Sequence, residues 1–365
     1  MMRFPSQDPL VDVTIAVHSA DRPISRAVSS VINHTQAPVR VNVVAHNIDL
    51  EVIRSNLGPL VSNPQVRLLT HRDNIASPAG PMNHGFASST APFLALLGSD
   101  DEFAPGAIDS WLELQRETKA EFVISRVRSE SGQTDPYPPT RWGCRSKRLD
   151  GAKDRLAYRS APLGLINRQA FKDLRFTEGL ASGEDLAYSL TIWFNAKCIA
   201  YDVKGPGYQG REDAKDRVTS APRSVSEDFE FLDTIEDLPW FRVAPSHVRT
   251  AIIVKIMRIH FFDAVRARLG SQEDIERELS DLVDLLDRLE KLSPRAFALL
   301  SLADHSLIKL LRHRQATRES LLAALDARYN YASTAAIFPR NPSLILHRQA
   351  PLRTLATGRL HQLRR

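Results

Sequence analysis

The sequence predicts an α/β domain built on a parallel sheet, followed by a mostly α-helical domain. Over the first third of the chain, short apolar segments typical of buried strands alternate with segments of helical periodicity. Beyond about Ser226 glycine becomes rare and the helical pattern continues. These observations divide the chain into an α/β domain over 1–225, a helical accessory domain over 226–335 and a basic tail over 336–365.

The predicted elements of the first domain follow one another closely. β-branched residues over 11–17 indicate a buried strand, and Asp21 can cap the next helix, with Pro23 in its first turn. The later elements are strands at 39–45, 66–69, 91–97 and 122–124, and helices at 50–60, 81–89 and 106–119. Because strands and helices alternate, we expect a parallel sheet with right-handed crossovers, as in nucleotide-binding domains.

The regular pattern stops between residues 126 and 159. This segment carries Tyr137 and Trp142 beside a basic group of Arg145, Lys147 and Arg148, which favours either a binding loop or a mobile insertion. Order resumes at 163–166, followed by a predicted helix over 167–173. A second helix over 186–196 is preceded by Ser182, Gly183, Glu184 and Asp185.

The helical domain contains a regular apolar seam. Apolar residues recur there every three or four positions, as on one face of a helix: Ile275, Leu279, Leu282, Leu286 and Leu289. The seam predicts packing against the chain's own helices or, as the alternative, self-association into a homo-oligomer.

The charge of the chain is modest, at +5 from 48 basic and 43 acidic residues, and does not require nucleic acid as a partner. From Arg340 onward there are six arginines and no acidic residue. This tail is either a solvated terminus or a peripheral contact with an anionic membrane or polymer.

Other features narrow the class of protein. Cys144 and Cys198 match no metal-ligand spacing, and the histidines show no zinc-binding arrangement on a helix. The first residues do not resemble an export signal, and the apolar stretch 251–262 is too short to span a membrane. We expect a cytoplasmic protein, or one held at the inner face of the cell membrane.

Acidic residues directly follow the apolar strand at 91–97. Gly98-Ser99-Asp100-Asp101 would lie at the carboxyl end of a buried strand, where α/β sheets bind ligands. Two carboxylates there can hold a divalent cation that in turn holds a diphosphate, although aspartate at such a place is also ordinary turn chemistry.

Together these segments resemble the family 2 glycosyltransferases of the GT-A fold, a Rossmann-like fold of nucleotide-diphospho-sugar transferases. The matching segments lie between Asp12 and Thr219: 14–18 with 21–23, Asn83-His84-Gly85-Phe86, Leu97-Gly98-Ser99-Asp100-Asp101, Glu184-Asp185, and 208–213 with 217–219. Gly98 stands where the family's acidic motif usually begins with aspartate.

The resemblance implies a role for each matching residue. Asp100 and Asp101 would hold Mg²⁺ or Mn²⁺, and Asp185, with Glu184 beside it, would be the general base of an inverting transfer. Residues expected to contact the donor are His18, Asp49, Asn83, Ser99, Asp100 and Arg211. Arg211 would reach the diphosphate, while Asp49, or else His46 and Asn47, would read the nucleotide base.

The resemblance implies a UDP-sugar donor and a glycan, polyol-phosphate or lipid-linked acceptor of the cell envelope. Helix capping by Ser182 and Asp185, and an ion pair of Arg211 with Glu212 or Asp213, are the structural alternatives for these residues. Two other functions stay open. A nucleotidyltransferase also needs carboxylate-bound metal, and a non-catalytic carbohydrate-binding or scaffolding relative would suit Gly98.

Overall fold

The computed structural model of the chain describes residues 8–141, 146–213, 223–270, 275–313 and 316–363. Trp142, Cys144, Arg145 and the segment 217–219, which the sequence analysis singled out, lie outside the described residues. Cys198 is half-buried, and its Sγ donates to the carbonyl of Thr118.

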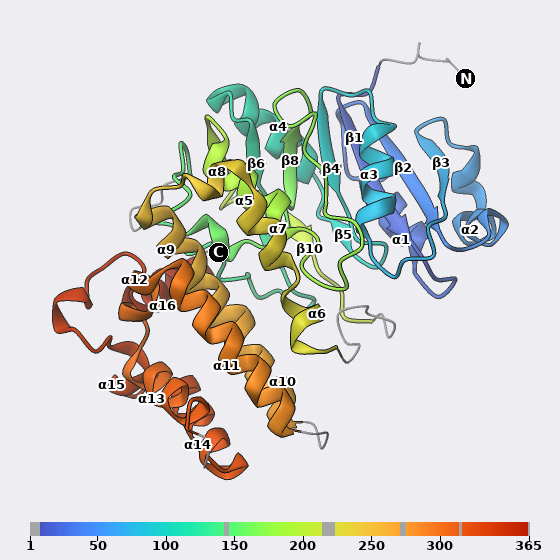
Figure 1. Cartoon of the computed structure of the whole chain (residues 1–365). Coiled ribbons are helices and arrows are strands. Elements are labelled where there is room, and N and C mark those ends of the chain that lie inside the picture. Colours follow the sequence, from blue (N-terminus) through green and yellow to red (C-terminus); the bar gives the residue numbers. More distant parts are fainter. Residues whose placement is uncertain (1–7, 142–145, 214–222, 271–274, 314–315, 364–365) are drawn as a thin grey trace.

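Seven strands of the described chain form one sheet in the order β3-β2-β1-β4-β8-β6-β9 (Figure 1). The strands are β1 Val11–Val17, β2 Val39–His46, β3 Val66–His71, β4 Phe93–Leu96, β6 Phe122–Ile124, β8 Gly164–Asn167 and β9 Ile199–Tyr201. Strand β8 runs antiparallel to both neighbours, so the expectation of a parallel sheet was wrong there. An irregular segment rather than a crossover helix precedes β8, so no helical crossover fixes its direction.

A second, three-stranded sheet consists of β5 Glu102–Phe103, β7 Val127–Arg128 and β10 Tyr208–Gln209. Strands of two residues are too short to show a periodicity, and the sequence analysis missed them. Strand β10 pairs with both others, which brings Tyr208 next to the acidic segment that begins at Gly98.

Five helices accompany the large sheet in the described residues: α1 Ile24–Asn33, α2 Leu50–Leu57, α3 Ala79–Ala87, α4 Ala107–Thr118 and α5 Leu186–Asn195. Their predicted positions are confirmed within a few residues. The expected cap of α1 is wrong, because Pro23 occupies that position and Asp21 is exposed without a capping hydrogen bond. The helix expected over 167–173 is also wrong, since residues 168–173 form turns.

The chain after residue 223 is helical, as expected. Its helices are α6 Val225–Phe229, α7 Phe231–Asp237, α8 Pro239–Arg242, α9 Ser246–Lys255, α10 Phe262–Gly270, α11 Ile275–Leu292, α12 Pro294–Ala298, α13 Leu302–Leu311, α14 Arg318–Tyr329, α15 Thr334–Ile337 and α16 Pro351–Leu363. A π-helix, Ile256–Phe261, joins α9 directly to α10.

Two apolar cores lie on the two faces of the large sheet. One contains β1 and β2 with α1 and α4, and the other extends from α3 and α5 into the helical region. Leu282, Leu286 and Leu289 are fully buried in the second core. The described part of the α11 seam therefore packs against the chain's own helices, as the first of the two predictions for it stated. The side chain of Ile275 lies outside the described residues.

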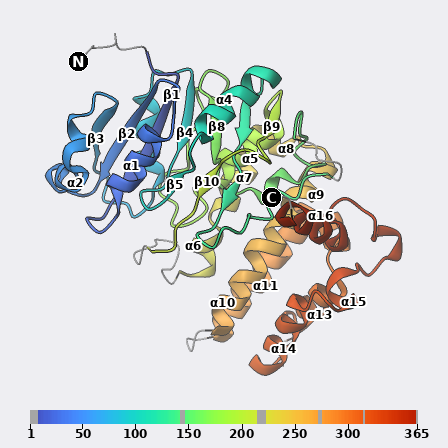
Figure 2. The same ribbon diagram turned by 180° about the vertical axis from the view of Figure 1, so that it is seen from behind.

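The C-terminal segment folds back against the sheet domain (Figure 2). The Nε2 of His361 in α16 lies 2.7 Å from the hydroxyl of Thr140, and Arg155 donates to the carbonyl of Arg348. The tail is thus packed through α16, while Arg340, Arg348 and Arg359 stay exposed. Among the described helices, none has the length and apolar composition needed to cross a membrane.

Asp12 joins three segments of the sheet domain. Its fully buried carboxylate accepts two hydrogen bonds from Arg40 in β2, at 2.7 and 2.8 Å. It also accepts from the backbone N–H groups of Thr90 and Ala91, just before β4. Strands β1, β2 and β4 are therefore fixed together at their amino ends.

Replacing Asp12 by alanine should lower the free energy of unfolding by roughly 3 kcal/mol, because a guanidinium and two N–H groups lose their acceptor. Urea unfolding monitored by circular dichroism measures this change. Asp21→Ala is the matched control, and its effect should stay within about 0.5 kcal/mol because Asp21 is exposed. Equal losses in the two variants would contradict the role given to Asp12.

Candidate active site

A cavity of about 670 Å³ opens at the carboxyl ends of β1, β2 and β4. Its walls include His18 after β1, His46 at the end of β2, and Ser99 and Asp100 after β4. Glu184 and Asp185, just before α5, line the same cavity. The structure thus brings together acidic segments that are more than 80 residues apart in the sequence.

Glu184 and Asp185 stand in the cavity wall with unusual electrostatics. Burial, with the adjacent Asp185 charge, raises the pKa of Glu184 to about 7. Burial also raises the pKa of Asp185, and the positive charge of Lys255 partly opposes this shift. The structural alternative for this pair is not supported, because neither Ser182 nor Asp185 caps α5 through its side chain.

Contacts on both sides hold the loop that carries this pair. Gly183 has φ +76°, and a β-carbon there would lie 2.7 Å from the ring of Phe231 in α7. On the other side, the Thr177 N–H donates to the Glu184 carbonyl at 3.0 Å. The loop is therefore pressed against the helical region in a conformation that favours glycine.

Asn83 supports this loop and does not line the cavity. Its side-chain amide donates to the carbonyl of Phe176 and to Glu178, and its oxygen accepts from the Phe176 N–H. The predicted donor contact of Asn83 is thus corrected to a structural role. The side chain ties α3 to the chain that leads to Glu184.

Asp101 is engaged by strand β10. Its Oδ2 accepts a hydrogen bond from the hydroxyl of Tyr208, and its Oδ1 accepts one from the Arg211 N–H at 2.8 Å. Burial and the nearby Asp101 charge raise the pKa of Tyr208 well above its ordinary value, so the phenol remains a donor. A β-carbon on Gly98 would lie 2.6 Å from Asp101 Oδ2, so a larger residue at position 98 would displace the Asp101 carboxylate from this arrangement.

Asp100 faces the cavity and pairs with a cation. Its Oδ2 lies 2.7 Å from Nη1 of Arg22, and both residues are largely buried. Arg26 donates to the backbone carbonyl of Asp100 and also pairs with Asp213 and Glu102. Two arginines from the start of α1 therefore hold the acidic segment in place.

These residues fit a divalent cation only in one way. No three described His, Cys, Asp or Glu side chains gather in a cluster that could hold a metal ion. Asp101 uses both oxygens within the protein, which does not support it as a second ligand, whereas Asp100 faces the cavity. A divalent cation here would therefore depend on Asp100, with oxygens of a bound diphosphate as further ligands.

A second cavity, of about 640 Å³, shares Arg22 and Asp100 with the first. Arg211 lines it, and its guanidinium lies 2.7 Å from Glu102 and 3.6 Å from Glu130. The ion pair expected between Arg211 and Glu212 or Asp213 is therefore wrong, and Glu102 and Glu130 are the partners instead. Arg211 lines the neighbouring cavity and not the first one, so the structure does not support its expected contact with the donor.

The prediction that Asp49 reads the nucleotide base is wrong, because of what lines the far end of the first cavity. Asp49 is exposed, does not line the cavity, and caps α2 by accepting from the Glu51 N–H at 3.0 Å. His46 and Asn47, the stated alternatives, do line it. The wall at this end is thus built from the segment that directly follows β2.

Asp73 holds this end of the cavity together. It accepts from His46 at 2.8 Å and from the side-chain amide of Asn47 at 3.1 Å. Burial opposes its ionisation, but hydrogen bonds from the Ile75 N–H, His46 and Asn47 outweigh this and lower its pKa. Asp73 is an acid after strand β3 that the sequence analysis missed, although its position after a predicted strand was a signal.

Arg22 and His260 are further cavity residues that the sequence analysis did not single out. Arg22 lies in a segment quoted only for its resemblance to the family. His260 comes from the π-helix, far from every quoted motif, and no local pattern could have identified it.

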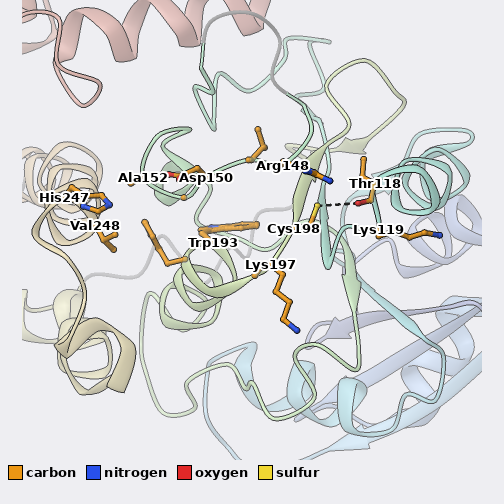
Figure 3. A pocket seen from close by; sticks show the side chains of 14 residues that line it. Thr118, Lys119, Arg148, Asp150, Ala152, Trp193, Lys197, Cys198, His247 and Val248 are labelled. Carbon is orange, nitrogen blue, oxygen red and sulfur yellow. Dashed lines mark hydrogen bonds between the residues drawn. The ribbon is translucent and has the colours of Figure 1, made fainter.

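Another cavity, of about 530 Å³, lies away from this site (Figure 3). Its lining includes Thr118 and Lys119 at the end of α4, Trp193 in α5 and His247 at the start of α9. Cys198 also lines it and directly precedes β9. This cavity therefore lies at the amino end of β9, whereas the acidic residues gather at the carboxyl ends of β1, β2 and β4.

Comparisons with known proteins agree with this geometry. Residues 12–175 match the family model described as Glycosyl transferase family 2. No curated protein matches the sequence significantly.

Solved structures of TarS from S. aureus share the fold. The crystal structure of TarS 1–349 with UDP-GlcNAc has a TM-score of 0.69 at 14% identity, over 87% of this chain and 90% of that one. The complex of TarS 1–349 with UDP has a TM-score of 0.67 at 15% identity, with the same coverage. A further crystal structure of TarS has a TM-score of 0.64 at 15% identity, over 87% of this chain and 55% of that one.

The family match covers the β-strands and acidic segment that form one side of the cavity, and the structural match extends through most of the helical region. The chain therefore carries a family 2 glycosyltransferase domain of the GT-A fold, with an added helical C-terminal region.

Proposed function

We propose that this protein is an inverting glycosyltransferase that moves a sugar from a UDP-sugar to a hydroxyl group of a cell-envelope acceptor. The family 2 domain gives the class of reaction. The observation that carries the proposal is that Ser99 and Asp100 line the same cavity as Glu184 and Asp185. A donor diphosphate and a general base can meet there.

The donor would lie along the carboxyl ends of the strands. Its base would occupy the end near His46 and Asn47, beside His18, and its diphosphate would lie near Ser99, Asp100 and Arg22. A guanidinium such as that of Arg22 suits phosphate oxygens. Uridine is supported by the TarS structures, which contain UDP-GlcNAc or UDP.

Asp185 would act as the general base. Its carboxylate would accept the proton of the acceptor hydroxyl while that oxygen attacks the anomeric carbon and the bond to the diphosphate breaks. Attack from the face opposite the leaving group inverts the anomeric configuration. The raised pKa of Asp185 suits this role, because a base with a pKa nearer neutrality accepts the proton more readily.

Asp100 would hold Mg²⁺ or Mn²⁺ together with the diphosphate. The cation supplies positive charge that stabilises the departing diphosphate. Asp101 would instead fix the acidic segment through Tyr208 and the Arg211 N–H.

The acceptor would approach through the second cavity, because that cavity meets the first at Arg22 and Asp100. Its lining contains the cations Arg128 and Arg211. A glycan, a polyol-phosphate polymer or a lipid-linked sugar could present a hydroxyl there.

Asp185→Asn should lower kcat by roughly 10²- to 10⁴-fold, because the amide cannot accept the proton. Binding of UDP should be retained. A coupled assay of UDP release measures the rate, and UDP-dependent thermal stabilisation measures binding. Asp173→Asn, an exposed acid on a neighbouring turn, is the matched control and should keep the wild-type rate. Wild-type activity in Asp185→Asn would exclude this residue as the base.

Asp100 and Asp101 should differ in their response to metal. Mn²⁺ with UDP at about 100 times the dissociation constant should stabilise the wild type by roughly 2.7 kcal/mol. Asp100→Asn should lose this metal-dependent gain, whereas Asp101→Asn should keep it and start from a lower melting temperature. Differential scanning fluorimetry with and without chelator measures both. Loss of the gain in Asp101→Asn alone would reverse the assignment.

The pH dependence of kcat/KM should reflect the ionisation of Asp185 and of the neighbouring Glu184. Transfer requires ionised Asp185, whose pKa is raised by burial, so kcat/KM should fall at a pH above the ordinary carboxyl range of about 4. Glu184→Gln removes the neighbouring negative charge and should move this acidic limb to lower pH. Profiles of kcat/KM between pH 5 and 9 test this, with Asp173→Asn as control. An acidic limb near pH 4 in the wild type would contradict the assignment.

A further inference from the structure

Two basic side chains of the helical region lie behind the cavity. Lys255, the last residue of α9, is only 2% exposed. Its Nζ lies 2.5 Å from Nε2 of His260, which comes from the π-helix. His260 also lines the cavity that contains Glu184 and Asp185. A buried lysine is thus joined to a histidine that lines the same cavity as the acidic pair.

The contacts around His260 connect it to the loop of the acidic pair. The rings of Phe231 and His260 are 5.4 Å apart, and Phe231 also packs against Gly183. A π-helix contains one extra residue in its turn and often lies at functional sites. Here this turn places Lys255 and His260, five residues apart, within hydrogen-bonding distance.

The protonation state of this pair follows from its surroundings. Burial, together with the Lys255 charge, lowers the pKa of His260 well below its ordinary value, so His260 is neutral. Burial lowers the pKa of Lys255 to about 7, while the negative charge of Asp185 raises it. Neutral His260 can then accept a hydrogen bond from the Lys255 ammonium group.

We propose that Lys255 and His260 are positioning residues of the transfer site. Lys255 supplies the buried positive charge that keeps Asp185 ionised, and His260 holds the ammonium group in place. The inference rests on the proposed role of Asp185 as the base. It makes the helical region part of the catalytic machinery, in addition to any role toward the acceptor.

The alternative is a purely structural hydrogen bond between two buried side chains. The charges around the acidic pair favour an electrostatic role for Lys255 over this structural one. The charged groups that act on the acidic pair are Arg223, before α6, which favours ionised Glu184, and Lys255, which favours ionised Asp185. A structural pair could be apolar, whereas a lysine buried to this extent is costly without a nearby negative charge.

The test is a direct titration of Asp185 in the full chain. Carboxyl carbons of aspartate are labelled with ¹³C, and the resonance missing in Asp185→Asn identifies Asp185. In Lys255→Met the pKa of Asp185 should rise by about one unit or more, because the compensating cation is lost. Lys309→Met, an exposed lysine of α13, is the control and should leave the titration unchanged. An unmoved Asp185 titration in Lys255→Met overturns the inference.

His260 is tested by two variants. His260→Gln retains an acceptor for Lys255 and should keep most of the wild-type titration, whereas His260→Leu should shift it in the same direction as Lys255→Met. If Lys255→Met does not fold, as judged by circular dichroism, His260→Leu carries the test. A wild-type titration in folded His260→Leu overturns the part of the inference that concerns His260.

The pH profile of transfer separates the inference from the proposed function. In Lys255→Met, kcat/KM should fall roughly tenfold near pH 7 and recover at higher pH, with UDP-dependent stabilisation unchanged. Equal losses at every pH would indicate a structural role and overturn the inference. A wild type that releases no UDP from any UDP-sugar overturns the proposed function, while the Asp185 titration still decides whether Lys255 governs that carboxylate.

Discussion

Phe231 packs against the α-carbon of Gly183, and this contact decides where the acidic pair lies. One side of the contact is the loop before α5, and the other is α7 of the helical region. Both belong to the same apolar core, which extends from α3 through α5 to α14 without interruption at residue 225. The position of Glu184 and Asp185 therefore depends on packing on both sides of this boundary, and the site is a product of the whole core.

The acidic segment after β4 is held by a different kind of interaction. Arg22, Arg26, Tyr208 and the Arg211 N–H all contact Asp100 or Asp101. Such hydrogen bonds and ion pairs hold carboxylates in a fixed orientation. Glycine at position 98 belongs to the same arrangement, since a β-carbon would reach the Asp101 carboxylate. The departure from the family's usual acidic motif thus has a steric explanation in this chain.

Much of the sheet domain could be predicted from the sequence, because the strands from β1 to β4 are long or strongly apolar and alternate with periodic helices. The antiparallel direction of β8 and the two-residue strands carry no comparable signal. The motifs located two acids that line the cavity, Asp100 and Asp185, because they lie at strand or helix ends that the pattern predicted. Asp49 and Asn83 were misassigned because a motif position does not reveal whether a side chain faces the cavity or an adjacent backbone.

The residues that sequence reasoning missed act through tertiary contacts. Asp73 reaches the cavity wall only through its hydrogen bonds with His46 and Asn47. Lys255 and His260 lie in the apolar stretch 251–262, which the sequence analysis considered only as a possible membrane span. Their relation to Asp185 depends on how α9 packs, which periodicity alone does not describe.

The π-helix between α9 and α10 also determines how α10 is rotated about the helix axis relative to α9. An α-helix advances by about 100° per residue, so removal of one residue from this turn would rotate α10 by about that angle relative to α9. His260 would then point away from the cavity, and the apolar face of α10 would leave the core that it shares with α14. Insertions or deletions in this turn should therefore be far rarer among functional relatives than substitutions, because the length of the turn sets both the lining of the cavity and the packing of α10.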